Sequence, residues 1–135
     1  MSANLDLVRS IYDAWGRGDF SSSAWADAEI EFTSVDGPDP GSWRGIAGMG
    51  ATNRDFLSVW QDWRVEAEEI LELDNERVLV LTRRGGRGKR SGLELWEPAA
   101  NLFHLRDGRA TRLVFYWERE RALADLGLTP QGDAT

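Results

Sequence analysis

The second half of the chain carries four strand patterns in succession, and this run constrains the fold more than any other feature. The patterns cover residues 65–73, 78–84, 91–106 and 109–117. Turn residues rather than helical patterns separate them, and Asp107-Gly108 is a strong signal for a two-residue hairpin turn. Strands joined by short turns pair antiparallel, so the sequence predicts an antiparallel sheet here.

Two details of this sheet follow from glycine and proline. Residues 85–88 contain three glycines and are predicted as the turn between the second and third strands. Pro98 lacks a backbone N–H and predicts a break or bulge in the long third strand. Because a bulge reverses the faces beyond it, the pattern leaves open which face of the sheet carries Glu94.

Helical patterns dominate the start of the chain. Residues 5–15 predict an amphipathic helix that ends at Gly16 and Gly18. Its apolar side chains are Val8, Ile11, Tyr12 and Trp15. The serines at 21–23 are expected to cap a short second helix that contains Trp25.

The middle of the chain combines a strand, a loop and a helix. Residues 29–33 alternate polar and apolar, as a half-buried strand does. Glycine and proline make residues 35–50 a long loop, and long loops are often functional lids. A third helix is expected over residues 49–62, and a short tail helix over residues 118–126. The apolar stripe of the third helix is Met49, Phe56, Trp60 and Trp63.

Helices followed by antiparallel strands define an α+β fold with helices on one face of the sheet. A chain of 135 residues has the size of one domain, so we expect a single domain over residues 1–135. Its core spans about residues 5–128, and the C-terminal tail after it is expected to be flexible. A curved, bulged sheet with a helix pressed into it leaves an internal cavity.

Charge and composition exclude several classes of protein. The net charge of −7 argues against nucleic acid and membrane surfaces as partners. The chain has no cysteine, which is typical of a cytoplasmic protein, and no apolar block of a secretory signal is visible in its first ten residues. His104 is the only histidine, so the usual zinc site cannot be built. We expect no metal and no cofactor, although an all-carboxylate Mg²⁺ or Ca²⁺ site stays open.

Seven tryptophans are many for a domain of this size. Core packing explains any single aromatic residue of the expected elements, but together they would overfill a plain core. A flat apolar cavity that holds a small apolar molecule is the alternative. The aromatic residues expected to line it are Trp15, Phe32, Phe56, Trp60, Phe103, Phe115 and Trp117.

The order of these elements and four short segments resemble the nuclear transport factor two-like superfamily, in its SnoaL-like polyketide cyclase and ketosteroid isomerase-like branch. The segments are residues 11–20 (IYDAWGRGDF), 43–45 (WRG), 105–109 (LRDGR) and 116–128 (YWERERALADLGL). The resemblance implies a cone-shaped fold, a deep apolar cavity and a homodimer formed through the outer face of the sheet. It does not fix the function, because the scaffold hosts isomerases, cyclases, dehydratases, epoxide hydrolases and binding proteins.

The resemblance also allows the catalytic positions of ketosteroid isomerases to be compared. Their general base falls near Phe32, which cannot accept a proton. Their oxyanion-binding acid falls on Asn101, which can still donate a hydrogen bond. Their tyrosine falls on Ile11, and Tyr12 points about 100° away from that position on a helix. The isomerase machinery is therefore mostly absent.

Three polar residues have two interpretations each. Asn101 shares the inward face of its strand with Phe103, so its amide either bonds locally or faces a ligand. Asp36 is either a base at the cavity mouth or a residue of an Asp-Gly turn. Glu94 either faces the cavity, paired with Arg83 or Arg84, or lies on the outer face.

Two further features have plain interpretations. His104 has the opposite parity to Asn101 and is expected on the surface or in a dimer interface. Residues 83–90 are rich in arginine, but they lack the ending of a phosphate-binding loop and are expected to form a solvated turn.

The sequence supports three functional hypotheses. The first is a cofactor-free isomerase, cyclase or dehydratase, with Asp36 or Glu94 as base and Asn101 or Tyr12 as donor to a developing oxyanion. The second is a binding or accessory protein without chemistry. The third and weakest is epoxide hydrolysis, which requires an Asp-Arg-Asp set that the sequence does not assemble.

Overall fold

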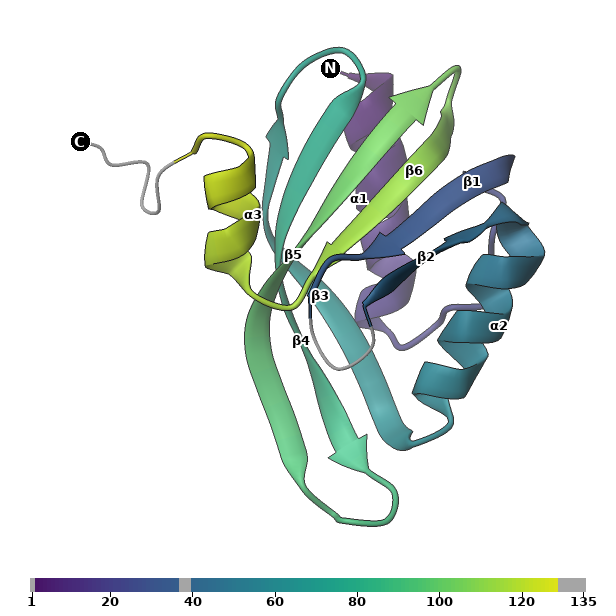
Figure 1. Ribbon diagram of the computed structural model, residues 1–135, viewed down its shortest axis with the longest axis vertical. Coiled ribbons are helices and arrows are strands. Elements are labelled where there is room, and N and C mark those ends of the chain that lie inside the picture. Colours follow the sequence, from purple (N-terminus) through teal and green to yellow (C-terminus); the bar gives the residue numbers. More distant parts are fainter. Residues whose placement is uncertain (1, 37–39, 129–135) are drawn as a thin grey trace.

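The computed structural model describes residues 2–36 and 40–128 of the chain. This part contains three helices and six strands, shown in Figure 1. In chain order they are α1 (Ala3–Gly16), β1 (Ala26–Ser34), β2 (Gly41–Arg44), α2 (Gly45–Leu57), β3 (Trp60–Glu72), β4 (Arg77–Gly88), β5 (Glu94–Arg106), β6 (Arg109–Tyr116) and α3 (Arg119–Asp125). The α+β class is confirmed.

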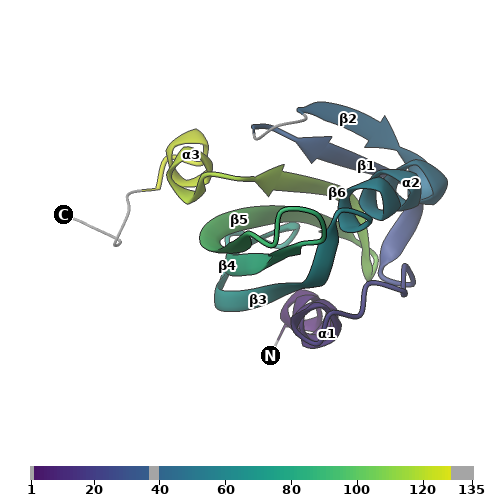
Figure 2. The same ribbon diagram turned by 90° about the horizontal axis from the view of Figure 1, so that it is seen from below.

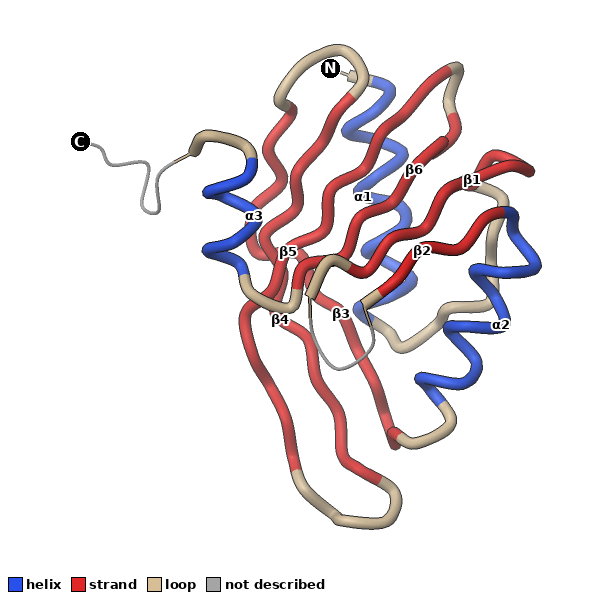
Figure 3. Tube along the Cα trace, viewed as in Figure 1, coloured by secondary structure: helices blue, strands red, loops and turns tan. Residues whose placement is uncertain are grey.

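The strands form one sheet in the order β2-β1-β6-β5-β4-β3 (Figure 3). All neighbouring pairs are antiparallel except β1 and β6, which run parallel. The four strands that the sequence predicts in antiparallel succession are β3, β4, β5 and β6, and each neighbouring pair among them is antiparallel. The predicted hairpin turn is confirmed, since Asp107 and Gly108 both have a positive φ, of 52° and 78°.

Helices cover both faces of the sheet. We call inner face the one that α1 and α2 cover, and outer face the one on which α3 packs. Figure 2 shows α1 beside β3 and α3 well away from it. The prediction that all helices share one face is therefore wrong, because α3 covers the outer side of β5 and β6.

The two faces explain the apolar sequence of β4. Val78 and Val80 are fully buried against α1 on the inner face, whereas Leu79 is fully buried under α3 on the outer face. A strand that is covered on both sides reads as a continuous apolar run rather than an alternating one. Asn101, Phe103 and their neighbours on β5 follow the predicted alternation.

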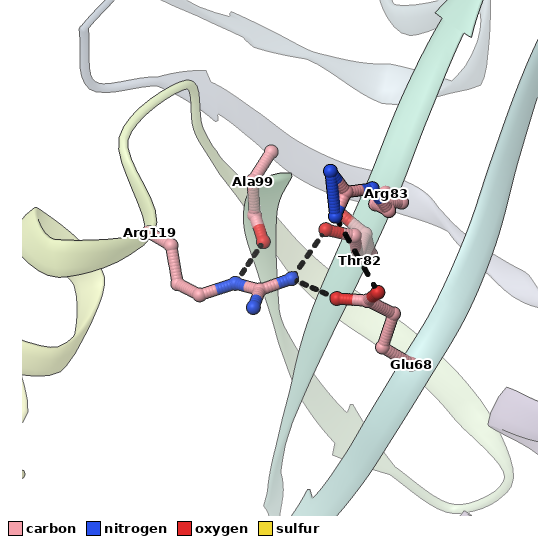
Figure 4. Close-up of polar contacts among 5 residues, drawn as sticks. All are labelled: Glu68, Thr82, Arg83, Ala99 and Arg119. Carbon is pink, nitrogen blue, oxygen red and sulfur yellow. Dashed lines mark hydrogen bonds and ion pairs between the residues drawn. The ribbon is translucent and has the colours of Figure 1, made fainter. Parts of the chain in front are cut away.

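Arg119, the first residue of α3, links this helix to the sheet by hydrogen bonds (Figure 4). Its Nη2 lies 2.6 Å from the carbonyl oxygen of Thr82 and 2.6 Å from Oε1 of Glu68. Its Nε donates to the carbonyl oxygen of Ala99 at 3.3 Å. Because β6 pairs with β5 only from Ala100 onward, the guanidinium satisfies a strand carbonyl just beyond the point where β6 ends.

Three expectations about the first half of the chain are wrong. Trp25 lies in a turn rather than a helix, and its Nε1 donates to the carbonyl oxygen of Ser22 at 3.0 Å. The long loop contains β2 and the start of α2, and residues 37–39 of it lie outside the described residues. The third helix ends at Leu57, so that Trp60 and Trp63 belong to β3.

An irregularity in β3 explains why the sequence predicts a longer helix. Asp62 has a positive φ of 59°, and the register of β3 with β4 shifts between Gln61 and Arg64. This irregularity places both Trp60 and Trp63 against Phe56, which imitates a helical stripe in the sequence.

The glycines at 85–88 are strand residues, not the predicted turn. A Cβ at Gly85 would collide with the carbonyl oxygen of Leu95, so glycine permits a close approach of β5. The turn follows at residues 89–93. The predicted break at Pro98 is also wrong, because the β4/β5 register runs without a shift from Arg77 to Arg87. Pro98 is tolerated because β6 does not reach this part of β5.

Candidate ligand-binding site

The helix α1 and the strand β5 bring Tyr12 and Asn101 together on the inner face. The Asn101 side-chain amide donates a hydrogen bond to the Tyr12 phenol oxygen, at 2.7 Å. Both residues are buried, with exposures of 5% for Tyr12 and 2% for Asn101. The position of Tyr12 on its helix predicts that it points away from the site, but the structure joins it to Asn101.

Burial determines the chemistry of this pair. Desolvation raises the pKa of Tyr12 far above its ordinary value, and the hydrogen bond from Asn101 opposes this rise only in part. The phenol therefore stays protonated at neutral pH. Since its oxygen already accepts from Asn101, its own proton is left to donate. The pair can stabilise a ligand oxygen but cannot remove a proton.

The residues around the pair are aromatic. The Tyr12 ring meets Trp15 edge-on at 5.0 Å between ring centres and Phe103 at 6.0 Å. Phe115 of β6 stands directly opposite Asn101 in the sheet. This environment excludes water and strengthens any hydrogen bond made inside it.

Arg84 is the main feature that the sequence analysis did not identify as a site residue. It lies on the inner face of β4, and its side chain is only 8% exposed. The guanidinium carbon lies 4.0 Å from the ring centre of Trp117 and 5.9 Å from that of Trp63. Within the described ranges, its Nη2 has no hydrogen-bond partner.

The charge state of Arg84 follows from its burial. Desolvation lowers the pKa of Arg84 to about 10, and the negative charges of Glu97 and Asp36 partly oppose this shift. The side chain therefore remains a cation at pH 7. The alternation of Val78, Val80, Thr82 and Arg84 along β4 was the signal that could have placed it inward.

Thr82 lies between these two polar positions. Asn101 stands opposite Val80, and Thr82 and Arg84 follow two and four residues farther along β4. The Thr82 hydroxyl is fully buried and has no partner among the residues that the structure describes. Three polar groups thus follow one line on the inner face, at intervals of about 7 Å along the strand.

The two carboxylates predicted as bases are placed differently. Oδ1 and Oδ2 of Asp36 accept hydrogen bonds from the backbone N–H groups of Trp117, at 2.6 Å, and Glu118, at 3.2 Å. Asp36 therefore fixes the segment between β6 and α3. A proton-abstracting role would have to compete with these bonds for the carboxylate oxygens.

Glu94 lies on the opposite side of β5 from Asn101, since seven residues and an unbroken register separate them. It is 71% exposed and pairs with Arg87 at 2.5 Å, so the outer-face alternative is confirmed and the cavity-facing one, with Arg83 or Arg84 as partner, is wrong. Both residues of the pair line an open surface pocket of about 480 Å³ beside Trp96.

The seven aromatic residues predicted to bind a ligand divide into two groups. Trp15, Phe32 and Phe103 are buried and belong to the hydrophobic core. The other four retain exposed surface, and they are Phe56, Trp60, Phe115 and Trp117. Phe56 contacts Trp63, Trp60 and Trp117 at ring-centre distances of 4.8, 6.2 and 6.2 Å, so an aromatic cluster reaches Arg84 through Trp63 and Trp117.

His104 stands outside the inner face, at the parity that the sequence predicts. Burial and then the nearby Arg112 and Arg77 lower its pKa, so it is neutral at pH 7. Among residues 2–36 and 40–128, no group of three or more His, Cys, Asp or Glu side chains is arranged to hold a metal ion. No helix in the described part of the chain is long and apolar enough to span a membrane.

An α+β fold whose described part has three helices packed on a six-stranded sheet matches a known class of domain. The family model described as SnoaL-like domain matches residues 8–113. The chain therefore belongs to the SnoaL-like domain family, within the nuclear transport factor two-like superfamily. A search of curated proteins gave no match.

Solved structures agree on the fold. A protein of unknown function with this fold from Burkholderia pseudomallei is 22% identical with a TM-score of 0.76, covering 92% of this chain and 97% of its own. A candidate SnoaL-like polyketide cyclase from Jannaschia is 16% identical with a TM-score of 0.74, covering 95% and 94%. TerC, co-crystallised with polyporic acid, is 20% identical with a TM-score of 0.73, covering 93% and 98%. These likenesses concern the fold alone.

Proposed function

We propose that the chain is a cytoplasmic small-molecule-binding domain. Its inner face holds a flat, largely apolar molecule in the cavity that the family resemblance implies, and the Tyr12–Asn101 pair donates a hydrogen bond to an oxygen of that molecule. The observation that carries this proposal is the 2.7 Å hydrogen bond that leaves the buried Tyr12 proton free to donate. A ketone or phenolate oxygen is the group that such a donor recognises.

The surrounding residues support an apolar ligand. Phe56, Phe115 and Trp117 are aromatic and partly exposed, and Phe56 and Phe115 pack against the inner core. Flat apolar surfaces with a few placed polar groups are typical of small-molecule sites. TerC was co-crystallised with a small molecule, which supports the same class of function for this chain.

Cofactor-free proton transfer is a second candidate. The protonated Tyr12, oriented by Asn101, favours it because a developing enolate would receive a hydrogen bond. Of the two carboxylates predicted as bases, Glu94 lies on the outer face, and Asp36 would first have to give up its bonds to Trp117 and Glu118. For this reason we rank binding above catalysis. No observation favours epoxide hydrolysis over ligand binding or proton transfer.

The experiment that separates these functions uses Tyr12→Phe. Binding of planar ketones such as 2-acetylnaphthalene is measured by calorimetry, and hydrogen–deuterium exchange at the carbon beside the carbonyl is followed by NMR. A binding protein gives an affinity that falls about tenfold in the variant, with no enzyme-dependent exchange. Exchange that the wild type accelerates and Tyr12→Phe does not would favour catalysis. No binding of any planar ketone would contradict both.

A further inference from the structure

The Arg84 guanidinium is a buried cation with an unused donor. Its Nη2 has no acceptor anywhere in residues 2–36 and 40–128, although the side chain is only 8% exposed. Buried charges in proteins are usually paired, because an unpaired one loses its hydration without compensation. The position therefore calls for an acceptor oxygen that the described chain does not supply.

The two carboxylates near Arg84 do not fill this place. Both Asp36 oxygens already accept backbone N–H groups of Trp117 and Glu118. Glu97 stands opposite Arg84 in the sheet but is exposed, so water screens its charge. Neither of them lies within ion-pair distance of Arg84 in the described structure.

The geometry around the guanidinium leaves its edge available. Trp117 covers one face of the group at 4.0 Å, and Trp63 lies farther off at 5.9 Å. The N–H groups of arginine lie in the plane of the guanidinium, so a stacked ring leaves them free for an acceptor approaching edge-on. Carboxylates are the acceptors that this fork fits best.

We infer that Arg84 is an anion subsite of the ligand-binding face, which pairs with a carboxylate or enolate oxygen of the bound molecule. The inference rests on the proposed function and adds the charge of the ligand to it. Arg84 lies four residues along β4 from the position opposite Asn101, so the two backbone positions are about 13 Å apart along the strand and a molecule that meets both side chains is elongated. The ligand is thus an elongated, flat acid with a second oxygen at its far end.

Matched probes test the charge of the ligand. Isothermal titration calorimetry at pH 7 compares 2-naphthoate with 2-naphthamide, which has the same shape without the charge. For an enolate, ionised 1,3-indandione is compared with its 2,2-dimethyl derivative, which cannot ionise. We expect the wild type to bind the anion of at least one pair about tenfold more tightly than its neutral partner. The pair that shows the preference identifies the anion.

Two variants assign the preference to Arg84. Arg84→Met removes the charge and keeps an apolar side chain, so it should bind both members of a pair equally. Arg84→Lys should keep part of the preference, since the charge remains but the fork is lost. Replacing a buried charge by an apolar side chain is often neutral or stabilising, so Arg84→Met should unfold at no lower a urea concentration than the wild type.

The possible results are distinct. Equal binding of anion and neutral compound by the wild type would overturn the subsite and leave the proposed function intact. A preference for the anion that Arg84→Met retains would overturn the assignment to Arg84, whether or not the variant is less stable. Absence of binding for every probe would contradict the proposed function and the subsite together.

Discussion

The Asp36 carboxylate accepts a 2.6 Å hydrogen bond from the backbone N–H of Trp117, eighty-one residues farther along the chain. This bond joins the end of β1 to the segment that leads from β6 into α3. Trp117 in turn covers one face of the Arg84 guanidinium. The residue first predicted as a base thus positions an aromatic side chain of the candidate site.

Replacing Asp36 by Ala should therefore loosen Trp117. Two N–H groups lose their acceptor, which we expect to lower the free energy of unfolding by about 1–3 kcal/mol. Urea denaturation measures the loss, and near-ultraviolet circular dichroism reports the tryptophan environment. Glu94→Ala is the matched control, because this carboxylate is exposed and should change stability by less than about 0.5 kcal/mol. Equal effects of the two substitutions would contradict the role given to Asp36.

The buried Tyr12 predicts a loss of stability in alkali. Its pKa is raised in the folded state, so the unfolded chain releases the phenol proton first, near its ordinary value of about 10. The contribution is fully present below that pH and is lost progressively as the pH rises above it. Urea unfolding at pH 8 to 11 should show a steeper decline for the wild type than for Tyr12→Phe. Tyr116→Phe removes a phenol that donates to Asp125 in a partly exposed contact, and it should keep most of the decline.

Arg119 should determine how firmly α3 docks. Arg119→Met removes the bonds to Thr82, Ala99 and Glu68, and we expect amide exchange in α3 to accelerate about tenfold or more. Arg121→Met is the control, since its ion pair with Asp125 is long and exposed. Unchanged protection of α3 in Arg119→Met would show that the apolar contacts of Ala122 and Leu123 alone hold the helix.

The homodimer implied by the family resemblance is also testable. Trp96 and Leu93, near the β4–β5 turn, are 45% and 65% exposed, which is high for large apolar side chains. We predict that the wild type is dimeric by light scattering and that Trp96→Ser shifts it toward monomer. Arg109→Ser, in the β5–β6 hairpin, should leave the mass unchanged. A wild-type monomer at high concentration would refute this prediction.

The sequence predicted the fold well where a short local pattern of residues is enough to determine the structure. The hairpin at Asp107-Gly108 depends on two backbone conformations that few residue types adopt, so this residue pair predicts the turn directly. The inward direction of Asn101 follows from strand parity in an unbroken register. Trp60 and Trp63 misled the prediction because a bulged strand can imitate helical spacing.

The candidate site was less predictable because it depends on contacts between distant segments. Tyr12 and Asn101 are eighty-nine residues apart, and no local sequence pattern predicts the hydrogen bond between them. Asp36 looked like a turn residue or a base, since its partners Trp117 and Glu118 are known only from the fold. Arg84 lay within a basic segment that suggested solvent, and only its parity on β4 pointed inward.

The most direct test of the account is to observe Asn101 while a ligand binds. In a ¹⁵N-labelled sample titrated with 2-acetylnaphthalene, the side-chain amide signals of Asn101 should shift, together with backbone signals of the inner-facing residues of β4 and β5. The shifts should saturate with the affinity measured by calorimetry. Shifts confined to the outer pocket around Arg87 and Glu94, with Asn101 unmoved, would contradict a ligand site at the Tyr12–Asn101 pair.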